Sequence, residues 1–151
     1  MKIFIHNLIE RFKSKLEGRT EPQYEIVWNL DKIRVQWLTV ENETKSLSFS
    51  WESILAIDTF KRDQITTDCI CLAFETSEGW VEINEDMKNW DAFLKAVELR
   101  IFGFPSYEQW YNKVMLPAFE TSHATLWNKK NQEQNQSHQS NPEQPCDFSK
   151  D

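Results

Sequence analysis

The chain has 151 residues, of which 40% are hydrophobic, and it contains seven tryptophans and ten phenylalanines but only three glycines. This composition excludes fibrous and wholly disordered proteins and predicts one domain with a substantial core. The formal net charge of −7 argues against general nucleic-acid binding and against anionic membrane surfaces, because both need a positive field, and it favours a basic partner.

The N-terminal segment predicts an amphipathic helix over residues 2–17, which Gly18 ends. Its apolar residues recur at helical spacing along one stripe: Ile5, Leu8, Ile9, Phe12 and Leu16. Arg11, Lys13 and Lys15 lie opposite that stripe. Helices that pack on a sheet and helices on membrane surfaces share this pattern, and packing on the sheet is the interpretation we favour.

Alternating apolar and polar residues then predict about six strands joined by short turns. The expected strands cover residues 24–28, 33–37, 47–51, 54–60, 69–74 and 80–83. The fifth is apolar on both faces, which is typical of a central strand covered on each side. Most tryptophans fall on apolar positions and are expected in the core: Trp28, Trp37, Trp51, Trp90 and Trp110.

Two further helices are expected after the strands. Apolar residues at helical spacing predict a helix over residues 85–102, with acidic residues in its first turn and Gly103 just past its end. Ser106 and Gln109 have the spacing of a capping box and predict a shorter helix that Pro117 ends.

Residues 119–127 form a last apolar stretch, either a short strand or an arm packed on the sheet. Residues 129–151 are polar, cannot recover their ordering entropy by burial, and are expected to be disordered. The sequence therefore predicts one α+β domain, residues 1–128, in which an antiparallel sheet is covered by an N-terminal helix and by C-terminal helices.

The three cysteines, Cys69, Cys71 and Cys146, do not form a secreted disulfide framework and indicate a reducing cytoplasm. Because His6 and Asn7 interrupt the N-terminal run and no cleavage site follows, we expect no signal peptide. A metal site on the face shared by Cys69 and Cys71 would need two more ligands, and none of the histidines has ligand spacing. We expect buried thiols and no metal.

Catalytic chemistry is sparse in the sequence. Three isolated glycines cannot build a phosphate-binding loop, so no cofactor is expected. Paired carboxylates such as Glu82 with Glu85 and Asp86 are present, but acidic residues at a helix start are usually partners of its dipole. We therefore predict that the protein is not an enzyme.

One candidate contact surface is the charged loop expected over residues 61–68. In it, Lys61 and Arg62 would pair with carboxylates of a partner, while Asp63 and Asp68 would meet its cations. An ordinary solvated turn is the alternative.

A second candidate is an acidic rim. Residues 51–100 carry eleven acidic and five basic side chains, a net charge of −6. The rim would consist of five carboxylates from the last hairpin and the helix start: Glu75, Glu78, Glu82, Glu85 and Asp86. It would fill a cationic cleft of a partner, and an ordinary solubilising surface is the alternative.

Several aromatic spacings suggest a family. The segments YEIVWN (24–29), WESILAI (51–57) and KRDQITTDCICLAF (61–74), an acidic helix start and a late tryptophan together resemble small bacterial proteins of pleckstrin-homology-like shape, over roughly residues 24–127. Some such proteins are immunity partners of antibacterial toxins. The resemblance implies a PH-like roll and a toxin-binding role, and it assigns no catalytic residues.

These observations leave three hypotheses of function. The first is a non-catalytic cytoplasmic immunity protein that binds and neutralises a basic toxin through an acidic surface. The second is a membrane-peripheral or scaffold module that uses the basic N-terminal helix. The third is a hydrolase with acidic catalytic residues.

Overall fold

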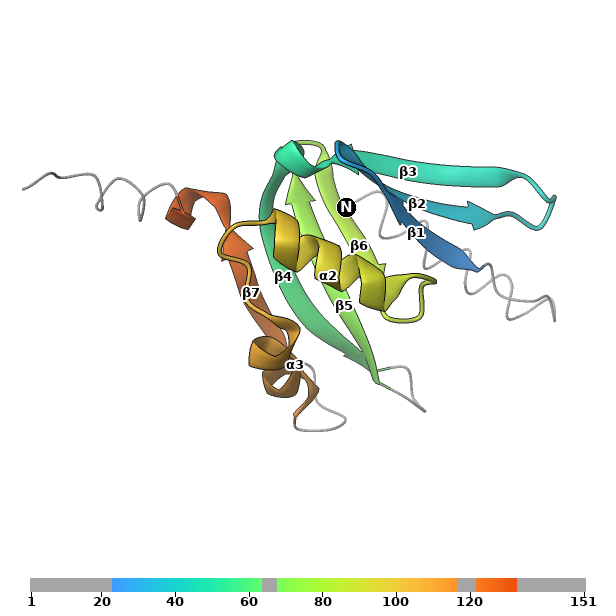
Figure 1. Cartoon of the computed structure of the whole chain (residues 1–151). Helices are drawn as coiled ribbons and strands as arrows, with labels where there is room; N and C mark the ends of the chain where they lie inside the picture. Colours follow the sequence, from blue (N-terminus) through green and yellow to red (C-terminus); the bar gives the residue numbers. More distant parts are fainter. Residues whose placement is uncertain (1–22, 64–67, 117–121, 133–151) are drawn as a thin grey trace, which may run out of the picture.

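The structure, a computed structural model, describes residues 23–63, 68–116 and 122–132 as an α+β arrangement (Figure 1). Two antiparallel sheets are present in this part of the chain, with strand orders β1-β2-β3 and β6-β5-β4-β7. The three-stranded sheet contains β1 (Tyr24–Trp28), β2 (Lys32–Leu38) and β3 (Thr44–Ser50). The four-stranded sheet contains β4 (Ile54–Asp63), β5 (Asp68–Thr76), β6 (Gly79–Asn84) and β7 (His123–Asn128).

The six predicted strands are confirmed, but they are divided between two sheets, and the last apolar stretch supplies a seventh strand. A single turn of 3-10 helix, η1 (Trp51–Ser53), separates the two sheets along the chain. The turns have local causes: the Asn29 side chain accepts hydrogen bonds from the amides of Asp31 and Lys32 at 2.9 and 2.8 Å. Gly79 closes the β5–β6 hairpin at a φ of +131°, which glycine adopts without strain.

Helices α2 (Trp90–Arg100) and α3 (Tyr107–Met115) follow β6. In Figure 1, α2 lies across one face of the four-stranded sheet and α3 lies nearer one end of it. The core forms where α2 meets both sheets: the ring of Phe93 lies 5.9 Å from that of Phe74 on β5 and 5.5 Å from that of Trp28 on β1. Trp90 and Trp110 are buried as expected, whereas Trp28, Trp37 and Trp51 are half-buried.

The four-stranded sheet has two chemically different faces. On the inner face, which α2 covers, Ile70, Leu72 and Phe74 of β5 are fully buried. The opposite face, here called the outer face, is defined by the residues that alternate with these in the register of the ladder. They are Asp58, Phe60 and Arg62 of β4, Cys69, Cys71, Ala73 and Glu75 of β5, and Trp80, Glu82 and Asn84 of β6.

The predicted helix over residues 85–102 starts later than expected. The Glu85 amide still donates to the Ile70 carbonyl at 3.0 Å, so this residue continues the ladder of β5 and β6. Asn89 adopts a left-handed conformation with a φ of +73°, which cannot belong to a right-handed helix. The helix therefore begins at Trp90, after a turn over residues 85–89.

The remaining predictions have mixed outcomes. The capping box of α3 is confirmed, because the Gln109 side chain accepts from the Ser106 amide at 3.1 Å. Residues 129–132, the start of the predicted tail, form a helical turn. The predicted N-terminal helix over residues 2–17 and the rest of the tail lie outside the described residues.

Candidate functional site

Both ends of the segment predicted as a charged loop over residues 61–68 belong to strands. Lys61, Arg62 and Asp63 extend β4, and Asp68 begins β5, because the ladder pairs Lys61 with Ile70 and Asp63 with Asp68. The expectation that Lys61 and Arg62 stand on a solvated loop is therefore wrong.

Lys61 lies on the inner face and is almost fully buried. Its Nζ atom is 3.3 Å from an Asp68 carboxylate oxygen, and the two side chains are 1% and 9% exposed. The same atom donates to the Met115 carbonyl at the end of α3, at 3.0 Å. A buried ammonium is tolerated when it is paired in this way. Lys61 thus holds β4, β5 and α3 together at one end of the sheet.

Arg62 lies on the outer face and pairs with Glu82 of β6. These residues come from the two strands that flank β5, so the pair spans β5 on the face that carries Cys71.

The pKa of the Cys71 thiol is raised, mainly by a hydrogen bond involving Cys69 and to a smaller extent by burial. Both cysteines are buried and form no disulfide with each other, and a thiol with a raised pKa is a poor nucleophile.

Glu85 and Asp86 lie in the turn before α2. One Glu85 carboxylate oxygen accepts from the Ile70 amide at 2.7 Å, and the Asp86 carboxylate lies 3.5 Å from the Cys69 sulfur. Burial raises the pKa of Glu85, and the hydrogen bond from the Ile70 amide lowers it by less. The negative charges of Asp86, Asp68 and Asp91 raise it further. The carboxylates around this turn therefore repel one another.

Asp91, an exposed residue in the first turn of α2, was missing from the predicted rim. Its position in a helix first turn was visible in the sequence, but its closeness to Glu85 depends on the turn that precedes Trp90. We call Glu85, Asp86 and Asp91 the acidic corner.

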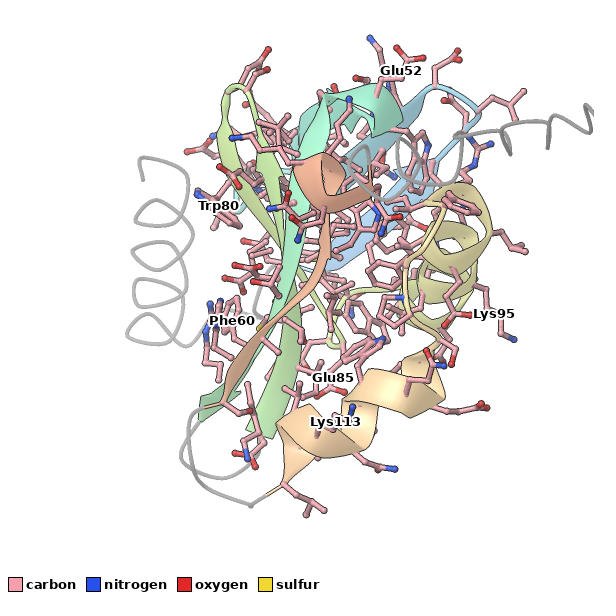
Figure 2. The ribbon with its side chains drawn as sticks, turned by 90° about the vertical axis from the view of Figure 1, so that its left-hand side faces the viewer. Glu52, Phe60, Trp80, Glu85, Lys95 and Lys113 are labelled. Carbon is pink, nitrogen blue, oxygen red and sulfur yellow. The ribbon has the colours of Figure 1, made fainter. Side chains whose placement is uncertain are left out.

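An open depression of about 460 Å³ adjoins the acidic corner. Its lining comes from the turn, the start of α2 and the start of α3: Glu85, Met87, Asn89, Trp90, Asp91, Ala92 and Tyr107. Figure 2 shows Glu85 on the side of the sheet that carries the helices, close to α3. Two carboxylates beside an indole and a phenol suit a lysine or arginine side chain, whose stem is apolar and whose end is charged.

The other predicted rim residues lie elsewhere. Glu75 pairs in register with Trp80 near the hairpin turn, and Glu78 lies in the turn itself. Five residues of strand separate Glu75 from Ile70, which Glu85 contacts, so the two ends lie roughly 17 Å apart. Glu82 is engaged with Arg62 on the outer face. The structure thus separates Glu85 from Glu75, Glu78 and Glu82, whereas the Asp86 carboxylate lies beside Cys69 on the outer face.

No protein-family model, curated protein or solved structure matches the chain. Within residues 23–63, 68–116 and 122–132, no group of three or more His, Cys, Asp or Glu side chains has the arrangement of a metal site. In the same part of the chain, no helix has the length and apolar character needed to cross a membrane.

Proposed function

We propose that this chain is a non-catalytic protein-binding domain of the cytoplasm, and specifically an immunity protein of PH-like shape that neutralises a basic bacterial toxin. The observation that carries the proposal is the acidic corner, where Glu85 and Asp91 line an open depression and Asp86 follows Glu85 in the same turn.

The proposed mechanism is electrostatic. A lysine or arginine of the toxin enters the depression, and its charge relieves the repulsion among the three carboxylates. Because Asp86 and Asp91 are exposed, their field also attracts the partner before contact and raises the association rate. Occupation of the toxin's cationic residues then blocks their access to substrate.

The test uses the product of the neighbouring gene as the candidate toxin. Co-expression with the wild-type chain should restore growth of cells that express this product. The purified pair should form a complex of fixed stoichiometry that weakens with salt.

Charge reversal locates the contact. Asp86→Lys combined with Asp91→Lys should slow association at least about tenfold at low salt. Glu78→Lys combined with Glu75→Lys makes the same change of charge at the hairpin turn and is the matched control. If both double variants slow association equally, the effect comes from the net charge of the protein and not from a contact at the acidic corner. If the wild-type chain does not restore growth, the immunity role is refuted.

A further inference from the structure

The outer face of the four-stranded sheet carries an apolar surface on which no described helix packs. Figure 2 shows Phe60 and Trp80 on one side of the sheet, whereas Lys95 of α2 and Lys113 of α3 lie on the other. Trp80 is 42% exposed and Phe60 is half-buried. A face that combines two aromatic rings with polar groups is suited to an amphipathic element.

Two polar groups of the outer face are buried. Asn84 is 6% exposed, and one carboxylate oxygen of Asp58 is inaccessible to water and accepts no hydrogen bond from the part of the chain that the structure describes. The other Asp58 oxygen lies 3.1 Å from a ring nitrogen of His123. Such groups favour a cover that brings hydrogen-bond donors.

We propose that residues 2–17 of the same chain occupy the outer face as an amphipathic helix. Its apolar stripe, which includes Ile9 and Phe12, would pack on Phe60 and Trp80. A helix of this length extends about 24 Å, close to the roughly 20 Å of a six-residue strand such as β6. The inference does not depend on the proposed function.

The connection to β1 makes this placement possible. The Lys88 amide donates to the Tyr24 carbonyl at 2.9 Å, and the Ile26 amide donates to the Lys88 carbonyl at 3.1 Å. The start of β1 is therefore held beside the segment that follows β6, and β6 is an edge strand of its sheet. Residues 18–23 reach at most about 20 Å, which is enough to pass around this edge to the outer face.

The charges are complementary. Residues 1–20 carry five basic and two acidic side chains, whereas the outer face carries three carboxylates and one guanidinium: Asp58, Glu75, Glu82 and Arg62. Of the three basic residues assigned opposite the stripe, Arg11 points furthest from it on a helix with about 100° per residue, whereas Lys13 and Lys15 lie nearer its two flanks. From there they reach carboxylates at the edges of the face.

This assignment also decides between two uses of the basic N-terminal segment. A segment that is packed on the outer face buries its apolar stripe against Phe60 and Trp80, so the same stripe is not available to a membrane. Glu85 lies on the helix side of the sheet (Figure 2), so the depression that it lines with Asp91 stays accessible to a partner.

The first test is zero-length carbodiimide cross-linking of the full chain, with an equal mixture of ¹⁵N-labelled and unlabelled protein. We expect Lys13 or Lys15 to be linked to Glu75, Glu82 or Asp58, in peptides that are wholly light or wholly heavy. Mixed peptides would assign the face to a second copy instead, and the absence of any link from Lys13 or Lys15 to these carboxylates would overturn the proposal.

The second test measures how the cover protects the thiols, in a Cys146→Ser background. Ile9→Asp with Phe12→Asp should speed the alkylation of Cys69 and Cys71 at least about tenfold, while circular dichroism stays that of the folded protein. Asn7→Asp with Ser14→Asp adds the same charge on the opposite side of the helix and should leave the rate unchanged. Equal rates in the two double variants would contradict the proposal, and if the first one fails to fold, the cross-linking result decides.

Discussion

Two consecutive cations of β4 make ion pairs on opposite faces of one sheet. Lys61, on the inner face, is paired with Asp68 where the side chains are 1% and 9% exposed, whereas Arg62, on the outer face, is paired with Glu82 at 24% and 13%. The Lys61 pair is closed by α3 through the carbonyl of Met115. The same local charge pattern therefore yields an almost fully buried pair on one face and a partly exposed pair on the other.

The largest effect should come from breaking the inner pair. Lys61→Met removes the cation beside the buried Asp68 carboxylate and the donor to the Met115 carbonyl, so the free energy of unfolding should fall by about 3–5 kcal/mol. Urea denaturation followed by circular dichroism measures it.

The matched control removes both charges. Lys61→Met with Asp68→Asn leaves no buried charge unpaired, so most of the lost stability should return. If the double variant lost the sum of the two single effects, the two side chains would not be coupled.

The outer pair should contribute less. Arg62→Met should lower the free energy of unfolding by about 1 kcal/mol, because solvent screens a pair in which one side chain is a quarter exposed.

Repeating both denaturation series in 1 M salt tests whether the two ion pairs differ in their screening by solvent. The cost of Arg62→Met should shrink, whereas that of Lys61→Met should stay nearly constant, because salt screens buried pairs much less. Equal salt dependence of the two variants would remove the distinction between the faces.

The strands were predictable from the sequence because their period of two is a local signal, but their ends were not. Lys61, Arg62 and Asp63 have the composition of a turn, and only pairing with β5 and the distant Met115 carbonyl makes them part of β4. Glu85 was assigned to a helix because acidic residues suit a first turn, yet its amide bonds to Ile70 on β5. In both places a contact between segments far apart in sequence overrides the local pattern.

The candidate site was predictable in charge but not in place. The sequence located the surplus of carboxylates between residues 51 and 100. It could not separate the two ends of the β5–β6 hairpin, since Glu78 and Glu85 lie only seven residues apart along the chain. Nor could it bring Tyr107 to the depression beside Asp91, because α3 reaches that place only through the packing of the two helices.

The smallest effect concerns Glu85, which adds a further negative charge near the inner pair. Burial, together with the charges of Asp86, Asp68 and Asp91, raises the pKa of Glu85 above its usual 4.5. A carboxyl with a raised pKa in the folded state favours folding fully only below its unfolded value, and this contribution is lost as the pH rises through the folded value. Glu85→Gln keeps an acceptor for the Ile70 amide but does not ionise. We therefore expect the free energy of unfolding of the Glu85→Gln variant, relative to that of the wild type, to increase as the pH rises from 4.5. The total increase should be smaller than the effect of Arg62→Met. Urea denaturation of both proteins across this range measures the difference, and a difference that is constant with pH would show that Glu85 ionises as readily in the folded chain as in the unfolded one.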